Sequence, residues 1–389
     1  MIIPPHLAHF PAPSPDAQTL SDQLSSAIEN EIQQAGGWIS FARYMALALY
    51  APGLGYYSAG SRKLGASGDF VTAPEISPLF ARCIARQLAQ LHGEGLHVVL
   101  EIGAGSGALA ADLLLELAVL GCAPASYLIL ELSADLRERQ REQITQRAPA
   151  LAERVRWLDV LPEQFDGVIL ANEVLDATPA HLVQTASDGL REAGVTIRQS
   201  GGFAREWRAA DAVLAETVSG LVLPDNYETE FNLAARALVA SLSRMMARGV
   251  MLFIDYGFPA HEFYHPQRSG GTLMCHYRHH AHGDPFAFVG LQDITTHVDF
   301  SAMASAASEG GATLAGYTSQ ANFLINCGIT ELLSRIPAGD VRAYAPLAAQ
   351  AQKLLSPAEM GELFKVIALS KNIDVPLLGF SRGDKSHTL

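Results

Sequence analysis

The stretch His97-Val-Val-Leu-Glu-Ile-Gly-Ala-Gly-Ser-Gly-Ala-Leu109 decides the fold, because it predicts a buried strand, a glycine turn and the start of a helix. The glycines at 103, 105 and 107 let the backbone turn tightly. They also let a ligand lie against the main chain, where a Cβ would collide with it. This strand–turn–helix unit predicts a nucleoside-binding Rossmann-like site at the carboxyl end of the strand.

Glu101, two residues before the first glycine, separates the enzyme classes that use such a loop. The spacing Gly103-x-Gly105-x-x-Ala108 also fits the dinucleotide fingerprint of hydride-transferring enzymes. A carboxylate at the end of the first strand would repel a pyrophosphate. S-adenosyl-L-methionine carries an ammonium and a sulfonium and no phosphate, so Glu101 favours a methyltransferase. The alternative is a glycine turn with an exposed Glu.

Acidic residues also end the next two predicted strands. Glu131 can accept hydrogen bonds from both hydroxyls of a ribose. Asp159 is placed to meet the adenine amino group, although a surface Asp in a turn fits equally well. The expected cofactor-binding residues are therefore Glu101, Gly103, Ala104, Gly105, Gly107, Glu131, Leu132, Asp159 and Asn172.

From His97 onward, short apolar runs alternate with helical patterns, which is typical of a parallel sheet covered on both faces. The expected strands are 98–102, 127–132, 155–160, 168–171 and 250–254, followed by a final pair at 312–317 and 364–369. Residues 181–208 predict a short antiparallel excursion. The fold class is α/β: a mostly parallel, seven-stranded, Rossmann-like class I methyltransferase sheet with an N-terminal helical cap and an antiparallel insertion.

The segment before His97 predicts helices. One begins near Thr19, a second spans 39–50, and a third begins at Thr72, where Thr72 and Glu75 have capping-box spacing. The expected organisation is a flexible Pro-rich arm (1–16), a helical cap with a substrate or cofactor loop (17–95), a methyltransferase domain (96–371) with insertions at 177–210 and 258–300, and a tail (372–389).

Asn172, Glu173 and Asp176 follow the fourth strand and should face the reacting methyl group, because ligands bind at the carboxyl ends of such strands. Carboxylates can orient a cationic acceptor and take its proton. These three residues are the expected catalytic set. The alternative is that Asp176 caps a helix and Glu173 forms a salt bridge.

A histidine-rich stretch at 275–299 invites a metal interpretation, with a solvated loop and a substrate-contacting loop as alternatives. Its spacing matches no compact ligand pattern, and methyl transfer needs no metal. We expect no metal and a role in binding substrate. The expected substrate-binding residues, from this stretch and from 53–75, are Tyr57, Asp69, Thr72, Pro74, Glu75, His276, Arg278 and His297.

The amino-acid composition argues against a nucleic-acid-binding protein and against a membrane-spanning one. The 389 residues are 49% hydrophobic, 17% charged and carry a net charge of −13, which argues against nucleic-acid binding. Four widely separated cysteines predict reduced thiols. The N-terminal stretch 1–18 has no Lys or Arg, and no apolar run reaches membrane-spanning length. We therefore expect a cytoplasmic protein with no membrane span.

Several motifs in fixed order resemble the MidA-like methyltransferase family over about 53–371. They are Gly55-Tyr-Tyr57, Gly68-Asp-Phe-Val-Thr-Ala-Pro-Glu-Ile-Ser77, Glu101-Ile-Gly-Ala-Gly-Ser-Gly107, Asn172-Glu-Val-Leu-Asp-Ala-Thr-Pro179, Asp255-Tyr-Gly257, Asp293-Ile-Thr-Thr-His-Val-Asp-Phe300 and Met360-Gly-Glu-Leu-Phe-Lys-Val-Ile-Ala368. Ala104 and Thr178 depart from the commoner Gly-Pro-Gly and Ala-Leu-Pro, but neither change removes a chemical group.

The resemblance implies a Rossmann-like fold, an S-adenosyl-L-methionine site at Glu101, Gly103, Gly105 and Glu131, and a protein substrate. Mitochondrial members of the family are arginine methyltransferases that assist assembly of respiratory complex I. The favoured hypothesis is a protein arginine methyltransferase whose Glu173 and Asp176 receive the guanidinium. A respiratory-complex subunit as substrate and a homodimer are further expectations. The alternatives are a small-molecule N- or O-methyltransferase, and a cofactor-binding assembly factor or chaperone.

Overall fold

The glycine stretch forms strand β2 (Val98–Ile102), a turn and helix α5 (Ala108–Val119) in a computed structural model. The structure describes residues 7, 9–59, 71–337 and 339–389. These residues divide into two units. The first unit draws on 1–70, 175–236 and 260–297, and the second on 71–174, 237–259 and 298–389.

The second unit contains the large sheet and the glycine loop. Its other strands are β3 (Ser126–Leu130), β4 (Val155–Leu158), β5 (Phe165–Asn172), β10 (Met246–Phe258), β14 (Val298–Asp299), β15 (Thr313–Ser319) and β16 (Phe364–Lys371). The strand order is β15-β16-β10-β5-β2-β3-β4, and β14 pairs with β10. Strands β4, β3, β2, β5 and β10 are mutually parallel, whereas β16 is antiparallel to both neighbours. The predicted five parallel strands and final pair of strands are confirmed.

Helices pack around this sheet because their apolar faces match its buried strands. They are α3 (Ala73–Ile76), α4 (Pro78–Gly93), α5, α6 (Ala134–Arg147), α10 (Phe300–Glu309), α11 (Gln320–Asn326), α12 (Ile329–Ser334) and α13 (Val341–Leu355), with short 3₁₀ turns η2 (Pro149–Arg154), η4 (Leu378–Phe380) and η5 (Ser386–Thr388). The apolar face of α4, with Phe80, Ile84 and Leu88 buried, joins the same core as the sheet residue Ile254. Helix α8 (Leu233–Met245) begins in the first unit and ends in the second.

The capping box expected at Thr72 is wrong. Thr72 precedes α3 but makes no side-chain capping bond, and α3 ends after one turn. Ser77 is extended and caps α4 instead, since its hydroxyl accepts from the Leu79 amide at 3.3 Å. The Glu75 carboxylate does not reach back to Thr72, because it accepts a hydrogen bond from Ser106 in the glycine loop. Residues 71–95, expected in the helical cap, belong to the unit with the large sheet.

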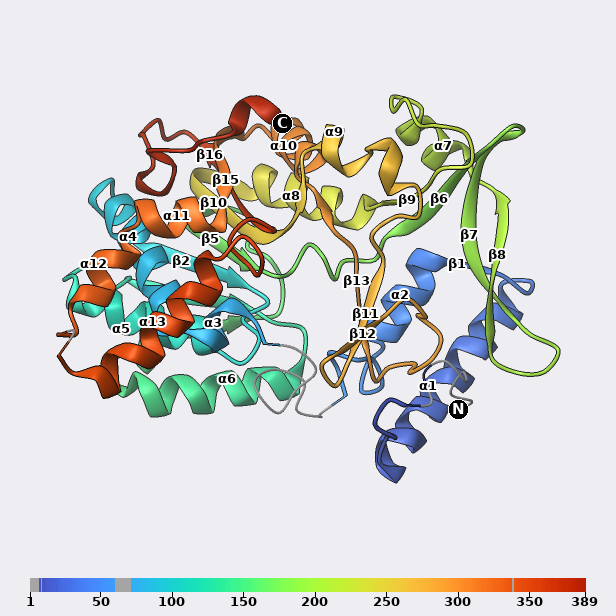
Figure 1. Cartoon of the computed structure of the whole chain (residues 1–389), viewed down its shortest axis with the longest axis horizontal. Helices are drawn as coiled ribbons and strands as arrows, with labels where there is room; N and C mark the ends of the chain where they lie inside the picture. Colours follow the sequence, from blue (N-terminus) through green and yellow to red (C-terminus); the bar gives the residue numbers. More distant parts are fainter. Residues whose placement is uncertain (1–6, 8, 60–70, 338) are drawn as a thin grey trace. The chain divides into compact units, whose positions relative to one another are not determined.

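The first unit is largely antiparallel. Its elements are α1 (Pro15–Gln34), β1 (Ile39–Ser40), α2 (Phe41–Tyr50), β6 (His181–Ala186), β7 (Gly189–Ile197), β8 (Phe203–Ala209), α7 (Ala212–Val218), β9 (Glu228–Phe231), α9 (Ala260–Phe263), η3 (Pro266–Arg268), β11 (Met274–Tyr277), β12 (His280–His282) and β13 (Asp293–Thr295). One sheet has the order β1-β7-β6-β9 with β8 beside β7, and a second has the order β12-β11-β13. Strands β7 and β8 form a long twisted ribbon (Figure 1), which confirms the antiparallel excursion.

The flexible arm expected over 1–16 stays a prediction, and the residues of it that the structure describes make apolar contacts. Leu7 is buried in an apolar cluster with Tyr277 and Phe288, and Phe10 packs against that cluster. The Phe10 ring also stacks on His280 with centroids 4.7 Å apart. Apolar contacts therefore hold this part of the arm, and α1 begins already at Pro15.

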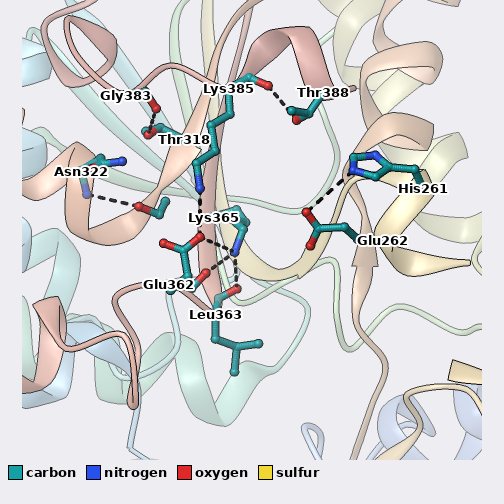
Figure 2. Close-up of polar contacts among 11 residues, drawn as sticks. His261, Glu262, Thr318, Asn322, Glu362, Leu363, Lys365, Gly383, Lys385 and Thr388 are labelled. Carbon is teal, nitrogen blue, oxygen red and sulfur yellow. Dashed lines mark hydrogen bonds and ion pairs between the residues drawn. The ribbon is translucent and has the colours of Figure 1, made fainter. Parts of the chain in front are cut away.

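The C-terminal tail closes the outer edge of β15. The Lys385 amide donates to the Tyr317 carbonyl at 2.6 Å, and the Thr318 hydroxyl donates to the Gly383 carbonyl at 2.7 Å. Lys385 Nζ also donates to Glu362 Oε1 at 3.0 Å (Figure 2). These bonds satisfy groups of an edge strand that would otherwise be open to pairing with another chain.

All four cysteines are buried and unbridged, as expected for reduced thiols. Within the described ranges, none of the helices is long and apolar enough to span a lipid bilayer.

Candidate active site

The glycine loop has a backbone shape that other residues would strain. Gly103, Gly105 and Gly107 have φ values of 65°, 53° and 84°, in the left-handed region that favours glycine. A Cβ on Gly103 would lie 3.0 Å from Val174 Cγ2, and one on Gly107 would lie 3.0 Å from the Gln140 Cα. Bare backbone is therefore required here, at the start of α5, where amide groups and the helix dipole can hold a polar ligand.

Glu101 lies beneath this loop and is buried, with 2% of its surface exposed. The Tyr127 hydroxyl donates a hydrogen bond to Glu101 Oε2 at 2.7 Å. Burial raises the pKa of Glu101 to about 7, although the Tyr127 hydrogen bond opposes that rise, and Glu131 adds to it. Glu101 is thus a carboxyl group whose charge a nearby cation would stabilise strongly.

Glu131 directly follows β3, and both of its carboxylate oxygens accept hydrogen bonds from the protein. Its Oε1 accepts from the Ser133 amide at 3.0 Å, and its Oε2 accepts from Gln140 Nε2 at 3.0 Å. Burial raises the pKa of Glu131, while these hydrogen bonds oppose the rise. The carboxylate plane is therefore fixed at the edge of the sheet where a ribose was expected.

Asp159 and Leu132 lie on the surface near the ends of β4 and β3. The Asp159 side chain is 86% exposed and pairs with Arg137 Nη1 at 2.6 Å. Arg137 also donates to the carbonyls of Glu131 and Leu158, at 2.6 and 2.7 Å, so it ties the two strand ends together. Leu132 is 77% exposed. The predicted contact of Asp159 with adenine and the predicted cofactor-binding role of Leu132 stay predictions.

The strand end at β5 carries Asn172 and Glu173. Asn172 Nδ2 donates to Glu173 Oε1 at 3.1 Å, while Asn172 Oδ1 is buried and accepts no hydrogen bond from any residue that the structure describes. Glu173 has φ 53°, a left-handed conformation that costs a non-glycine residue free energy and often marks functional sites. Its amide donates to the Ile254 carbonyl at 2.9 Å, and Asp255 Oδ2 accepts from the Val174 amide at 3.2 Å. Two bonds to β10 thus hold this backbone.

Among the expected substrate-binding residues, Thr72, Pro74 and Glu75 lie in the second unit and are half-buried. Glu75 contacts the glycine loop, because the Ser106 hydroxyl donates to its Oε1. This contact puts a carboxylate next to the start of α5. Asp69, also expected to bind substrate, lies outside the described residues.

Tyr57, His276, Arg278, His297 and the catalytic candidate Asp176 lie in the first unit. The Tyr57 hydroxyl lies 3.0 Å from both carboxylate oxygens of the buried Asp293. The pKa of the Tyr57 hydroxyl is raised well above its usual range. Burial is the largest cause, and the negative charge of Asp293 is the next largest.

Asp176 is buried, and its carbonyl accepts from the Thr296 amide at 3.0 Å. The next element after Asp176 is strand β6, so the helix-cap alternative is wrong.

The histidine-rich stretch forms β11 and β12. Arg278 and His279 have φ values of 46° and 64°, and they join the two strands in a tight hairpin turn. Nowhere in the described chain do three metal-ligating side chains gather as a metal site would require.

Sequence reasoning missed Gln140, Arg137 and Tyr127, which hold the expected ligand residues in place. Gln140 lies on α6, a helix rich in charged residues that has the character of a solvated surface element. Only Gln140 and Ile144 of α6 are buried. The sequence contains one signal of this burial. Gln140 and Ile144 are uncharged and four residues apart, so they lie on the same face of the helix.

The sequence model of a family described as S-adenosyl-L-methionine-dependent methyltransferases matches residues 79–318, which is more than half of the chain. The chain belongs to this family. A protein from Burkholderia thailandensis, whose crystal structure holds S-adenosyl-homocysteine, is 54% identical, with a TM-score of 0.95 and coverage of 97% of this chain and 100% of that one. The fold and the reaction class predicted from the glycine loop are thus confirmed.

Proteins named "Protein arginine methyltransferase NDUFAF7, mitochondrial" are also similar. The one from Danio rerio is 30% identical over 89% of this chain and 90% of its own length. The one from Mus musculus is 30% identical over 86% of this chain and 81% of its own length. The resemblance to the MidA-like family is confirmed by these relatives together with the family match.

The residues of the second unit fit the cofactor of this family. A Cβ at Gly103 or Gly107 would be crowded at 3.0 Å from its neighbours, and the glycine loop offers bare backbone at a helix start. Glu101 and Glu131 supply negative charge and hydrogen-bond acceptors, and the buried Asn172 Oδ1 is a further acceptor. This donor and acceptor set suits a cationic nucleoside without phosphate.

Proposed function

We propose that this chain transfers a methyl group from S-adenosyl-L-methionine to the guanidinium of an arginine in a protein substrate. The observation that carries the proposal is the similarity to the Danio rerio protein arginine methyltransferase over 90% of that protein's length. The carboxylate at the end of β5 supports it, because a guanidinium with a pKa above about 12 needs an anionic partner that can also accept its proton.

For the cofactor, we propose that Glu131 receives the ribose hydroxyls and that the glycine loop lies against the rest of the molecule. Glu101, buried beneath the loop, stabilises its positive charge. When bound, S-adenosyl-L-methionine supplies a methyl group already activated by a positively charged sulfur. The work left to the protein is positioning and removal of a proton.

Glu173 has the features of the residue that binds the acceptor nitrogen. It is half-buried at the carboxyl end of β5, where ligands of open α/β sheets bind. Asn172 donates to one of its oxygens, which orients the carboxylate. We propose that this carboxylate orients the guanidinium and accepts the proton that leaves its nitrogen. Asp176 is a second candidate for the same cation.

The test is to incubate the purified chain with methyl-labelled S-adenosyl-L-methionine and lysate from its own organism. Acid hydrolysis of labelled protein then identifies the methylated amino acid. The proposal expects label in a discrete protein, recovered as methylarginine, and loss of that label with Glu173→Gln. Label recovered on another amino acid or only in small metabolites would overturn the arginine assignment.

Three finer points are part of this proposal. The protein substrate is a subunit of a respiratory complex, the chain forms a homodimer, and it acts in the cytoplasm. Identification of the labelled protein tests the first point, sedimentation of the purified chain tests the second, and cell fractionation tests the third.

A further inference from the structure

Gln140 joins the glycine loop to the acid at the end of β3 through one side-chain amide. Its Nε2 donates to the Gly105 carbonyl at 3.0 Å and to Glu131 Oε2 at 3.0 Å. Its Oε1 accepts from Trp157 Nε1 at 2.8 Å. The residue is fully buried, so each polar atom of this amide has a partner within the protein.

The indole of Trp157 determines which way the amide faces. An indole nitrogen can only donate, so its partner on Gln140 must be the amide oxygen. The Nε2 group is then directed to the other side, where two acceptors take its two hydrogens. One acceptor lies on the loop at Gly105, and the other is the carboxylate of Glu131.

The backbone of α6 at Gln140 also packs closely against the glycine loop. A Cβ on Gly107 would lie 3.0 Å from Gln140 Cα and 3.3 Å from its Cβ. The loop, Glu131 and β4 therefore meet at one residue of α6. A shift of Gln140 would disturb the glycine backbone and the carboxylate together.

We propose that Gln140 is a positioning residue that fixes Glu131, in its ionised form, at a set distance from the glycine loop, ready to receive the vicinal hydroxyls of a ribose. This rests on the proposed cofactor site and is independent of the methyl acceptor. Gln140 does not touch the ligand in this role. It acts through Glu131, whose second oxygen is held by the Ser133 amide.

Two measurable consequences follow. Because a donor on Glu131 favours its charged form, loss of the Gln140 amide raises the pKa of Glu131 above its already raised value. Binding of a ribose should then weaken most at low pH. A ligand that lacks the two hydroxyls makes no use of this carboxylate, so its affinity should respond much less.

The experiment is calorimetric titration of S-adenosyl-homocysteine, and of its 2′,3′-dideoxy analogue, into the full chain at pH 6 and pH 8. Gln140→Met keeps the side-chain length and removes the amide. The expected result is about tenfold weaker binding of S-adenosyl-homocysteine at pH 8, as for loss of a hydrogen bond to a charged group, and a larger loss at pH 6. The analogue should lose much less. Gln146→Leu, an exposed position on the same helix, is the matched control.

Should Gln140→Met fail to fold, Trp157→Phe is the second variant, because it leaves Gln140 in place and removes the donor that orients its amide. It should show a smaller loss with the same dependence on pH and on the ribose hydroxyls. Unchanged affinity in the folded variant, or an equal loss for both ligands at both pH values, would overturn the proposal. Failure of the unaltered chain to bind S-adenosyl-homocysteine would instead overturn the proposed function.

Discussion

Replacing Glu101 by Gln should stabilise the ligand-free protein at alkaline pH. The Gln side chain has nearly the shape of a protonated Glu, and its oxygen can still accept from the Tyr127 hydroxyl. In the folded chain the pKa of Glu101 rises from 4.5 to about 7, because the carboxyl is buried. A neutral amide avoids the free energy needed to ionise the acid there.

The sign and size follow from proton linkage. Since the folded pKa is raised, the contribution of Glu101 to stability is complete below pH 4.5 and is lost as the pH rises through about 7. A rise from 4.5 to about 7 corresponds to about 3 kcal/mol. The free energy of unfolding of Glu101→Gln should therefore be larger than that of the unaltered chain, by about 3 kcal/mol at pH 8.5 and by about 1 kcal/mol at pH 5.

Urea unfolding of both proteins at pH 5 and pH 8.5, without ligand, measures this difference. Calorimetric titration of S-adenosyl-homocysteine near pH 6.5, in buffers of different ionisation enthalpy, is a second test, because it measures the number of protons released on binding. If the ligand's ammonium group lies near Glu101, binding should displace a proton from Glu101 in the unaltered chain and none in the variant. A stability difference that does not change with pH would show that Glu101 does not titrate with a raised pKa in the folded protein.

Gly107→Ala should unfold at a lower temperature, because φ 84° strains a non-glycine residue by about 1–2 kcal/mol and the new Cβ lies 3.0 Å from Gln140 Cα. An unchanged melting temperature would contradict this. Glu173→Gln should transfer label about a hundredfold more slowly while binding S-adenosyl-homocysteine within about twofold of the unaltered chain; full activity would remove Glu173 from the mechanism. Tyr57→Phe should destabilise the protein by about 1–3 kcal/mol in urea unfolding, because the buried Asp293 carboxylate loses its hydroxyl donor. Equal stability would show that this bond contributes nothing.

The parallel sheet was predictable from the sequence because its signal is local. The run Val98–Ile102 is apolar enough to be buried on both faces, and the glycines that follow it leave few alternatives to a turn. The Glu101 side chain was expected to face the ligand. The structure adds its burial and its bond to Tyr127, which comes from a neighbouring strand 26 residues away.

Contacts between distant segments were the part that local patterns could not reveal. Glu75 has the right spacing to cap a helix at Thr72, yet it bonds to Ser106, 31 residues further on. The prolines of the N-terminal arm predicted no structure, whereas Phe10 finds aromatic partners around Phe288. Gln140 has the character of one more polar residue of a surface helix, and only the positions of the loop and β4 around it reveal its role.

The proposal on which the others depend is that this chain methylates arginine in a protein. Mass spectrometry of the proteome of its own organism, with and without an intact gene for this chain, tests it without assuming a substrate. We predict that at least one arginine carries a methyl or dimethyl group only when the gene is intact, and that Glu173→Gln behaves like the deletion. An unchanged pattern of arginine methylation in the deletion strain would rule the proposal out.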